Sequence, residues 1–198
     1  MEALIFEDIM SPGVILSNCI ELSGTHKYYP DYLQVDQVII LTLSDKLVPS
    51  NLPKRSALVY NINLYITDEN GNIAYFDCDM QHTYNTGQIR KEHKEYKAVG
   101  GKEALHSDMD AGHFGLALGQ HPSIAMEQHK HTNRYGAWRK FEIDWNKLSG
   151  EGHKVNVKAV FVEGDEKGTY SPFWCIRETI DENEDGASEY VITNDDLQ

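Results

Sequence analysis

The sequence predicts a single α+β domain built on a mainly antiparallel sheet, and three observations support this prediction. The chain has 198 residues, of which 40% are hydrophobic, and this is enough for one sizeable core. Several apolar segments alternate with polar residues, as strands with one buried face do. The clearest helical spacing is confined to 138–148, so strands are expected to dominate.

The first expected strand covers 37–43, where apolar residues dominate. Residues 56–66 and 73–76 flank an Asn70-Gly71 pair, and two such runs around Asn-Gly predict a β-hairpin. Residues 84–109 are polar and contain three glycines, so a loop or a broken strand is expected there.

A helix is expected after this loop, and it ends near Gly150. Its two tryptophans are expected to anchor it to the core rather than to stack on nucleic-acid bases. Strands at 155–161 and 173–176, an acidic turn at 181–186 and a short strand at 190–192 complete the layout. In the expected helix, the apolar residues at helical spacing are Trp138, Phe141, Trp145 and Leu148.

Residues 51–198 are expected to form this domain, with residues 1–50 as an N-terminal segment of unassigned role packed on it. Residues 1–20 show no signal peptide, and no run approaches the roughly 18 apolar residues of a membrane span. No membrane partner is therefore expected. The three cysteines form no CxxC pair, which argues against a disulfide framework and a cysteine zinc site, and they are expected to be buried thiols.

The net charge of −13 argues against nucleic-acid binding, because phosphates attract basic surfaces. The charge is uneven, however. Residues 1–80 carry −7 and residues 159–198 carry −9, whereas residues 81–158 carry 12 basic and 9 acidic side chains, a net +3. This distribution fits a locally attractive cleft on an acidic body, and a solvated basic surface would give the same count.

The net-positive segment also contains the residues with the clearest chemical interpretation. Asp110-Ala111-Gly112-His113 is followed, about twenty residues later, by an Asn-Arg-Tyr-Gly-Ala-Trp-Arg-Lys-Phe-Glu run at 133–142. Phosphodiester hydrolysis needs a water, a base to deprotonate it, and positive charge on the phosphate. The imidazole of His113 is the candidate base, since its ordinary pKa is about 6.5. Asp110 could accept a hydrogen bond and fix a tautomer or the loop.

These residues resemble the DNA/RNA non-specific endonuclease family of ββα-metal (His-Me finger) nucleases, especially the nuclease domains of bacterial polymorphic toxins. The family's Asp-Arg-Gly-His is matched by 110–113, and its later Asn, Gly-Ala-Trp and Glu by Asn133, 136–138 and Glu142. Gln128 matches the Gln of the family's Pro-Gln pair. The resemblance extends loosely from about residue 58 to 186 and leaves the first 50 residues uncovered.

The resemblance implies a ββα-metal motif within the domain, with His113 as general base. It implies that Asn133 is a ligand of Mg²⁺ or Mn²⁺ and that Glu142 is a carboxylate holding the metal's water shell. Without the resemblance, Asn133 would be taken as a helix N-cap and Glu142 as a solvated surface residue.

Three departures from the family pattern affect these assignments. Ala111 replaces the family's Arg; Arg139, Arg90 or Arg134 could supply the missing cation, and Arg139 is included among the candidate catalytic residues. Ile124 and Glu127 stand where the family has Asn and Pro. The spacing from Asn133 to Glu142 is one residue longer than is typical of the family.

The longer spacing matters because nine steps along an uninterrupted helix place Asn133 and Glu142 about 180° apart. If the helix begins after Gly136, Asn133 would lie in the preceding loop and could turn toward Glu142. Otherwise His129 or His131 becomes the better metal ligand. Seven of the nine histidines lie between residues 82 and 131, so a zinc site was considered, but their spacing matches no strong zinc pattern.

The leading interpretation is a metal-dependent endonuclease that hydrolyses phosphodiester bonds of DNA, and of RNA as a second substrate, with little sequence preference. The resemblance also suggests a delivered bacterial effector, acting in the target-cell cytoplasm and restrained by a cognate immunity protein. The alternative is a catalytically degenerate member of the fold that serves as an acidic protein-interaction module. The altered supports at Ala111 and Ile124 favour this alternative.

Overall fold

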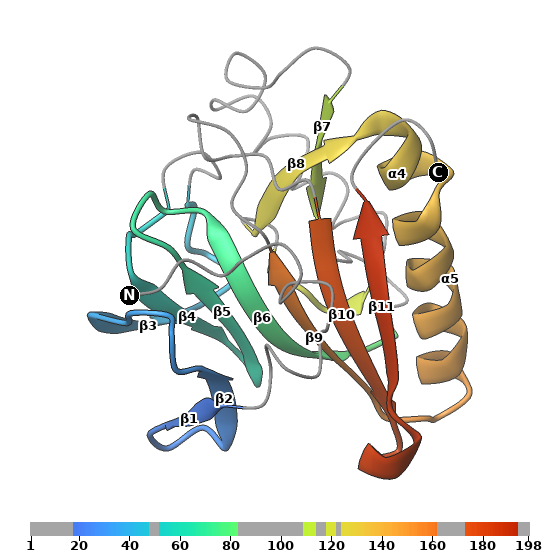
Figure 1. Cartoon of the computed structure of the whole chain (residues 1–198), viewed down its shortest axis with the longest axis horizontal. Helices are drawn as coiled ribbons and strands as arrows, with labels where there is room; N and C mark the ends of the chain where they lie inside the picture. Colours follow the sequence, from blue (N-terminus) through green and yellow to red (C-terminus); the bar gives the residue numbers. More distant parts are fainter. Residues whose placement is uncertain are drawn as a thin grey trace.

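The structure is a computed structural model, and it describes residues 18–47, 52–82, 109–113, 118–121, 124–161 and 173–193. Within these ranges, the side chains of 109–113, 125–127 and 173 are outside the description. The loop or broken strand predicted for 84–109 lies almost wholly outside it. The α+β class and the mainly antiparallel sheet predicted from sequence are confirmed (Figure 1).

A seven-stranded sheet forms the body of the domain, in the order β11-β10-β9-β6-β5-β4-β3. Every neighbouring pair is antiparallel except β3 and β4, which are parallel. The strands are β3 (Gln37–Leu41), β4 (Ser56–Tyr60), β5 (Asn63–Thr67), β6 (Ile73–Met80), β9 (Val155–Phe161), β10 (Phe173–Ile180) and β11 (Ser188–Thr193).

The predicted Asn-Gly hairpin is confirmed, because β5 and β6 pair across a turn in which Gly71 has a φ of 89°. The prediction of one strand over 56–66 is wrong. Residues 61 and 62 form a second tight turn, with Asn61 at a φ of 54°. Alternation continues unchanged through a two-residue turn, so the pattern cannot reveal it, and Asn is among the few residues that adopt this conformation readily.

One face of the sheet is covered by helix α5 (Ala137–Gly150), as predicted (Figure 1). Trp138 and Trp145 are fully buried, with ring centroids 5.4 Å apart in an edge-to-face arrangement. Trp138 meets Trp174 of β10 in the same way at 5.2 Å. The two helix tryptophans are therefore core anchors, and burial of such large apolar surfaces is the main force that holds α5 to the sheet.

The other face is covered by a segment that the sequence analysis left unassigned. A small hairpin of β1 (Cys19–Leu22) and β2 (Lys27–Pro30) contributes Leu22 and Tyr29 to this second core. Lys27 extends from the hairpin to Asp77 on β6, with 2.9 Å between Nζ and Oδ1. The expectation of buried thiols holds for Cys78 and Cys175, whereas Cys19 is exposed because this hairpin lies at the surface.

The acidic turn predicted at 181–186 is confirmed and ends in the short 3₁₀ helix η3 (Glu184–Gly186). Arg177 of β10 binds two carboxylates around this turn, those of Glu184 and Glu189. Within the described ranges, no helix is long and apolar enough to cross a membrane.

Candidate functional site

The predicted site residues belong to one continuous supersecondary unit, which we call the ββα unit. Strand β7 (Met109–His113) pairs antiparallel with β8 (Ala125–His129), with His113 opposite Ala125 and Asp110 opposite Gln128. Strand β8 passes directly into the short helix α4 (Lys130–Arg134), which precedes α5 (Figure 1). Asn133 lies on α4, while Arg139 and Glu142 lie on α5.

The turn that leads into β8 is fixed to the main sheet by buried polar contacts. His121 Nε2 lies 2.9 Å from the carbonyl oxygen of Thr42, just beyond β3. The hydroxyl of Tyr65 donates a hydrogen bond to the side-chain oxygen of Gln120. Burial lowers the pKa of His121, although the Thr42 carbonyl and the carboxylate of Asp45 act in the opposite direction. His121 is therefore neutral near pH 7, which matches its buried position.

The helical segment is broken between Arg134 and Ala137, so the condition that α5 begins after Gly136 is met. The backbone N–H groups of Tyr135 and Gly136 both donate to the carbonyl of His131, at 2.9 and 2.7 Å, and end α4. Gly136 is extended and occupies the N-cap of α5, which begins at Ala137. Asn133 lies in α4 rather than in the expected loop, because one further helical turn forms before the break. Asn133 is also not a helix cap, since His129 and Gly136 occupy the two N-cap positions.

The side chain of Glu142 is only 15% exposed, so it is not the solvated surface residue that its sequence position would ordinarily suggest. Burial raises its pKa from 4.5 to about 7, against the opposing effect of the Arg139 guanidinium. Arg139 Nη1 is 3.3 Å from Glu142 Oε2. Within the described ranges, Glu142 contacts one cation, and a buried carboxylate of this kind is suited to binding a further one.

On β8 and α4, three side-chain atoms of two residues are buried without hydrogen bonds in the described part of the chain. Gln128 is fully buried, and neither its side-chain oxygen nor its nitrogen has a partner. The Nδ1 atom of His131 is in the same situation. Such atoms cost free energy unless a partner satisfies them, so they often mark a site where another group binds.

Of the two alternative metal ligands, His129 is already held by a local hydrogen bond, whereas His131 has the unpartnered Nδ1 atom described above. His129 Nδ1 accepts a hydrogen bond from the backbone N–H of His131 and so serves as a helix cap. His82 Nδ1 lies 2.7 Å from Asn146 Oδ1. Among the residues that the structure describes, no three His, Cys, Asp or Glu side chains gather as a metal site, so these histidines form no zinc site there.

Several predicted site groups lie outside the described residues. The backbone of Asp110 and His113 is described as part of β7, but their side chains are not, and Arg90 is outside the described ranges. Ile124, which stands where the resembled family has Asn, is fully buried in the main core. The polar support expected at this position is thus replaced by apolar packing.

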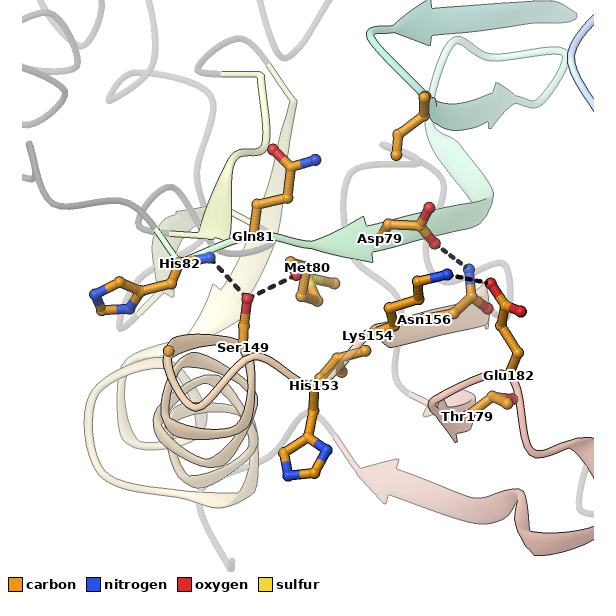
Figure 2. A pocket seen from close by; sticks show the side chains of 13 residues that line it. Asp79, Met80, Gln81, His82, Ser149, His153, Lys154, Asn156, Thr179 and Glu182 are labelled. Carbon is orange, nitrogen blue, oxygen red and sulfur yellow. Dashed lines mark hydrogen bonds and ion pairs between the residues drawn. The ribbon is translucent and has the colours of Figure 1, made fainter.

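A pocket of about 570 Å³ lies at the other end of α5, next to Ser149 and Gly150 (Figure 2). Its polar lining is already paired: Lys154 binds Glu182 at 2.8 Å, and Ser149 Oγ accepts from the backbone N–H of His82. Seven helical steps, about 10 Å along the axis, separate Glu142 from Ser149 at the edge of this pocket. The pocket is therefore distinct from the ββα site.

Comparison with protein-family models and with curated proteins gives no match for this chain. Among solved structures, NucA from Streptococcus agalactiae with no metal bound matches 96% of this chain and 88% of its own, with 11% identity and a TM-score of 0.53. NucA with a magnesium ion bound matches 62% of this chain and 67% of its own, with 14% identity and a TM-score of 0.49. The metal-free structure shows that the fold is shared.

The Arg139–Glu142 contact was not predicted, although a signal for it existed. Residues three apart on a helix are neighbours, so the i, i+3 spacing of the two residues could have identified the pair. The burial of Glu142 left no such signal, because it depends on the packing of α5 against the sheet.

Proposed function

We propose that this chain is a metal-dependent endonuclease that hydrolyses phosphodiester bonds of DNA, and of RNA as a second substrate, with little sequence preference. The observation that carries the proposal is the ββα unit. The strand with Asp110 and His113 pairs with β8, which runs directly into the helices of Asn133 and Glu142. The fold shared with the nuclease NucA from Streptococcus agalactiae supports the same proposal.

Asn133 and Glu142 are the residues that would hold the metal ion. An amide oxygen and a carboxylate suit Mg²⁺ or Mn²⁺, which keep much of their water shell and need few protein ligands. The buried Glu142 carboxyl fits this role, since a bound cation would favour its ionised form. The ion would supply positive charge to the phosphate as negative charge develops on it.

The chain's own groups perform the proton transfer and orientation. In the proposal, the neutral imidazole of His113 removes a proton from the attacking water, and Asp110 accepts a hydrogen bond that fixes a tautomer or the loop. Arg139 replaces the cation lost at Ala111. A guanidinium has five N–H donors, so Arg139 could contact Glu142 and a phosphate oxygen together.

Degradation of plasmid DNA and total RNA by the purified protein tests the proposal. Cleavage is expected with Mg²⁺ or Mn²⁺ and none in EDTA. The cleavage rate of His113→Ala should be about a hundredfold lower than that of the wild type. His153→Ala is the matched control. His153 pairs with Asp181 beyond the far end of α5, so this variant should cleave as the wild type does. A wild-type protein inert with every metal would favour the degenerate, protein-binding alternative.

The toxin role is a second part of the proposal, and it rests on the resemblance to polymorphic-toxin nuclease domains. Expression in a bacterial cytoplasm should arrest growth and degrade the host's nucleic acid, whereas His113→Ala should be harmless at the same protein level. A cognate immunity protein would restore growth to cells that express the wild type. Normal growth with active, soluble nuclease present would contradict the effector role.

A further inference from the structure

The residues on either side of the break between α4 and α5 include four with exposed side chains, which we call the junction surface: Arg134, Tyr135, Arg139 and Lys140. Tyr135 is 72% exposed, which is unusual for a large aromatic side chain. It occupies the residue at which α4 ends, and its backbone is fixed by the hydrogen bond to His131. The centroid of its ring is 6.4 Å from that of the His131 ring, and the two planes are tilted by 48°.

The charge of the junction surface is opposite to that of the whole chain. Three of its four residues are cations and none is an acid, on a protein with a net charge of −13. An exposed cationic group on an acidic protein selects an anionic partner. Arg139 also contacts Glu142, so the surface adjoins the carboxylate of the candidate site.

We propose that the junction surface binds a single-stranded segment of nucleic acid, with one base stacked on Tyr135 and the adjacent phosphates held by Arg134 and Lys140. An aromatic ring flanked by cations is the combination that single-strand binders use, because every base has a face that can stack. Bases inside a duplex are already stacked on one another and cannot reach such a ring. This inference rests on the proposed nuclease function and adds a preference for unpaired substrate.

Binding in EDTA tests the proposal without cleavage. The probes are a fluorescent single strand of about 12 nucleotides and a duplex of the same sequence, at about 50 mM salt, followed by anisotropy. Tyr135→Ala should weaken single-strand binding by about 5- to 150-fold, the usual effect of losing one stacked base, and leave duplex binding unchanged. Tyr135→Phe should bind as the wild type does. Lys140→Gln should weaken both and reduce the salt dependence by about one phosphate contact.

Tyr28→Ala is the matched control, since Tyr28 is an exposed tyrosine on the β1–β2 hairpin, far from α4 in Figure 1. The inference is overturned if Tyr135→Ala binds the single strand as tightly as the wild type, if it weakens both probes equally, or if the wild type binds neither probe. Cleavage is measured separately from binding, so that the two proposals can fail independently. Stacking at Tyr135 without any metal-dependent cleavage would overturn the proposed function alone, and cleavage with binding independent of Tyr135 would overturn this inference alone.

Discussion

Arg139 Nη1 lies 3.3 Å from Glu142 Oε2, one turn apart on α5, and this pair connects an exposed cationic surface to a largely buried carboxylate. The contact favours the ionised form of Glu142, yet burial outweighs it and leaves the pKa near 7. Glu142 can therefore change its charge in the range where most enzymes work. Two of the following predictions test this property, and two test the packing of the fold.

The metal-free protein should become less stable as the pH rises from about 5 to 8. The unfolded carboxyl ionises near its ordinary pKa of 4.5, whereas the folded one keeps its proton up to about pH 7. Glu142 thus costs nothing below pH 4.5, and its cost grows to at most about 3 kcal/mol above pH 7. Urea unfolding in EDTA should show Glu142→Gln to be more stable than the wild type at pH 8, with the difference shrinking at about pH 5. An equal difference at both pH values would contradict the raised pKa.

Added Mg²⁺ or Mn²⁺ should raise the melting temperature more at about pH 8 than at about pH 6, because a ligand carboxyl must lose its proton to bind the ion. Chelation should reverse the shift, and both Glu142→Gln and Asn133→Ala should reduce or abolish it. Asp144→Asn changes an exposed acid on the same helix and should keep the full shift. A shift of the same size in all four proteins would mean that the ion binds elsewhere.

Lys27→Met should destabilise the fold by about 3–5 kcal/mol, because it leaves the Asp77 carboxylate buried without its cation. The Lys27 side chain is 12% exposed and that of Asp77 is 4% exposed, and Asn156 donates to Asp77 from a neighbouring strand. Lys154→Met breaks a fully solvated ion pair and should leave the urea midpoint unchanged. Similar midpoints for the two variants would show that Lys27 does not hold the β1–β2 hairpin to the sheet.

Gly71→Ala should destabilise the β5–β6 turn by about 3 kcal/mol or more. Gly71 has a φ of +89°, and an added Cβ would lie 2.5 Å from the backbone oxygen of Leu52, which cannot move aside as a flexible side chain could. Gly24 shares the positive φ, at +78°, but no neighbouring atom lies within 4 Å of an added Cβ. Gly24→Ala should therefore cost only about 1–2 kcal/mol, and thermal unfolding of both variants measures the difference.

The sequence by itself determined the elements that depend on local periodicity and local backbone chemistry. Helical spacing identified α5 and its buried tryptophans, and Asn70-Gly71 identified the β5–β6 turn. It also offered a helix start after Gly136 as one way to relieve the long Asn133-to-Glu142 spacing, and α5 does begin at Ala137, although Asn133 lies in α4 and not in a loop. These features follow from where neighbouring side chains point along one strand or one helix.

Only the tertiary structure decided the features that depend on which distant segment packs against an element. The turn at Asn61 lies within a segment whose apolar and polar residues continue to alternate, so the sequence pattern does not reveal it. The β1–β2 hairpin covers the second face of the sheet through contacts between residues distant in sequence. The burial of Glu142 and the exposure of Tyr135 have the same origin. Periodicity reports the direction of a side chain relative to its own backbone, whereas solvation and charge depend on which other segment packs against it, and that information is not local.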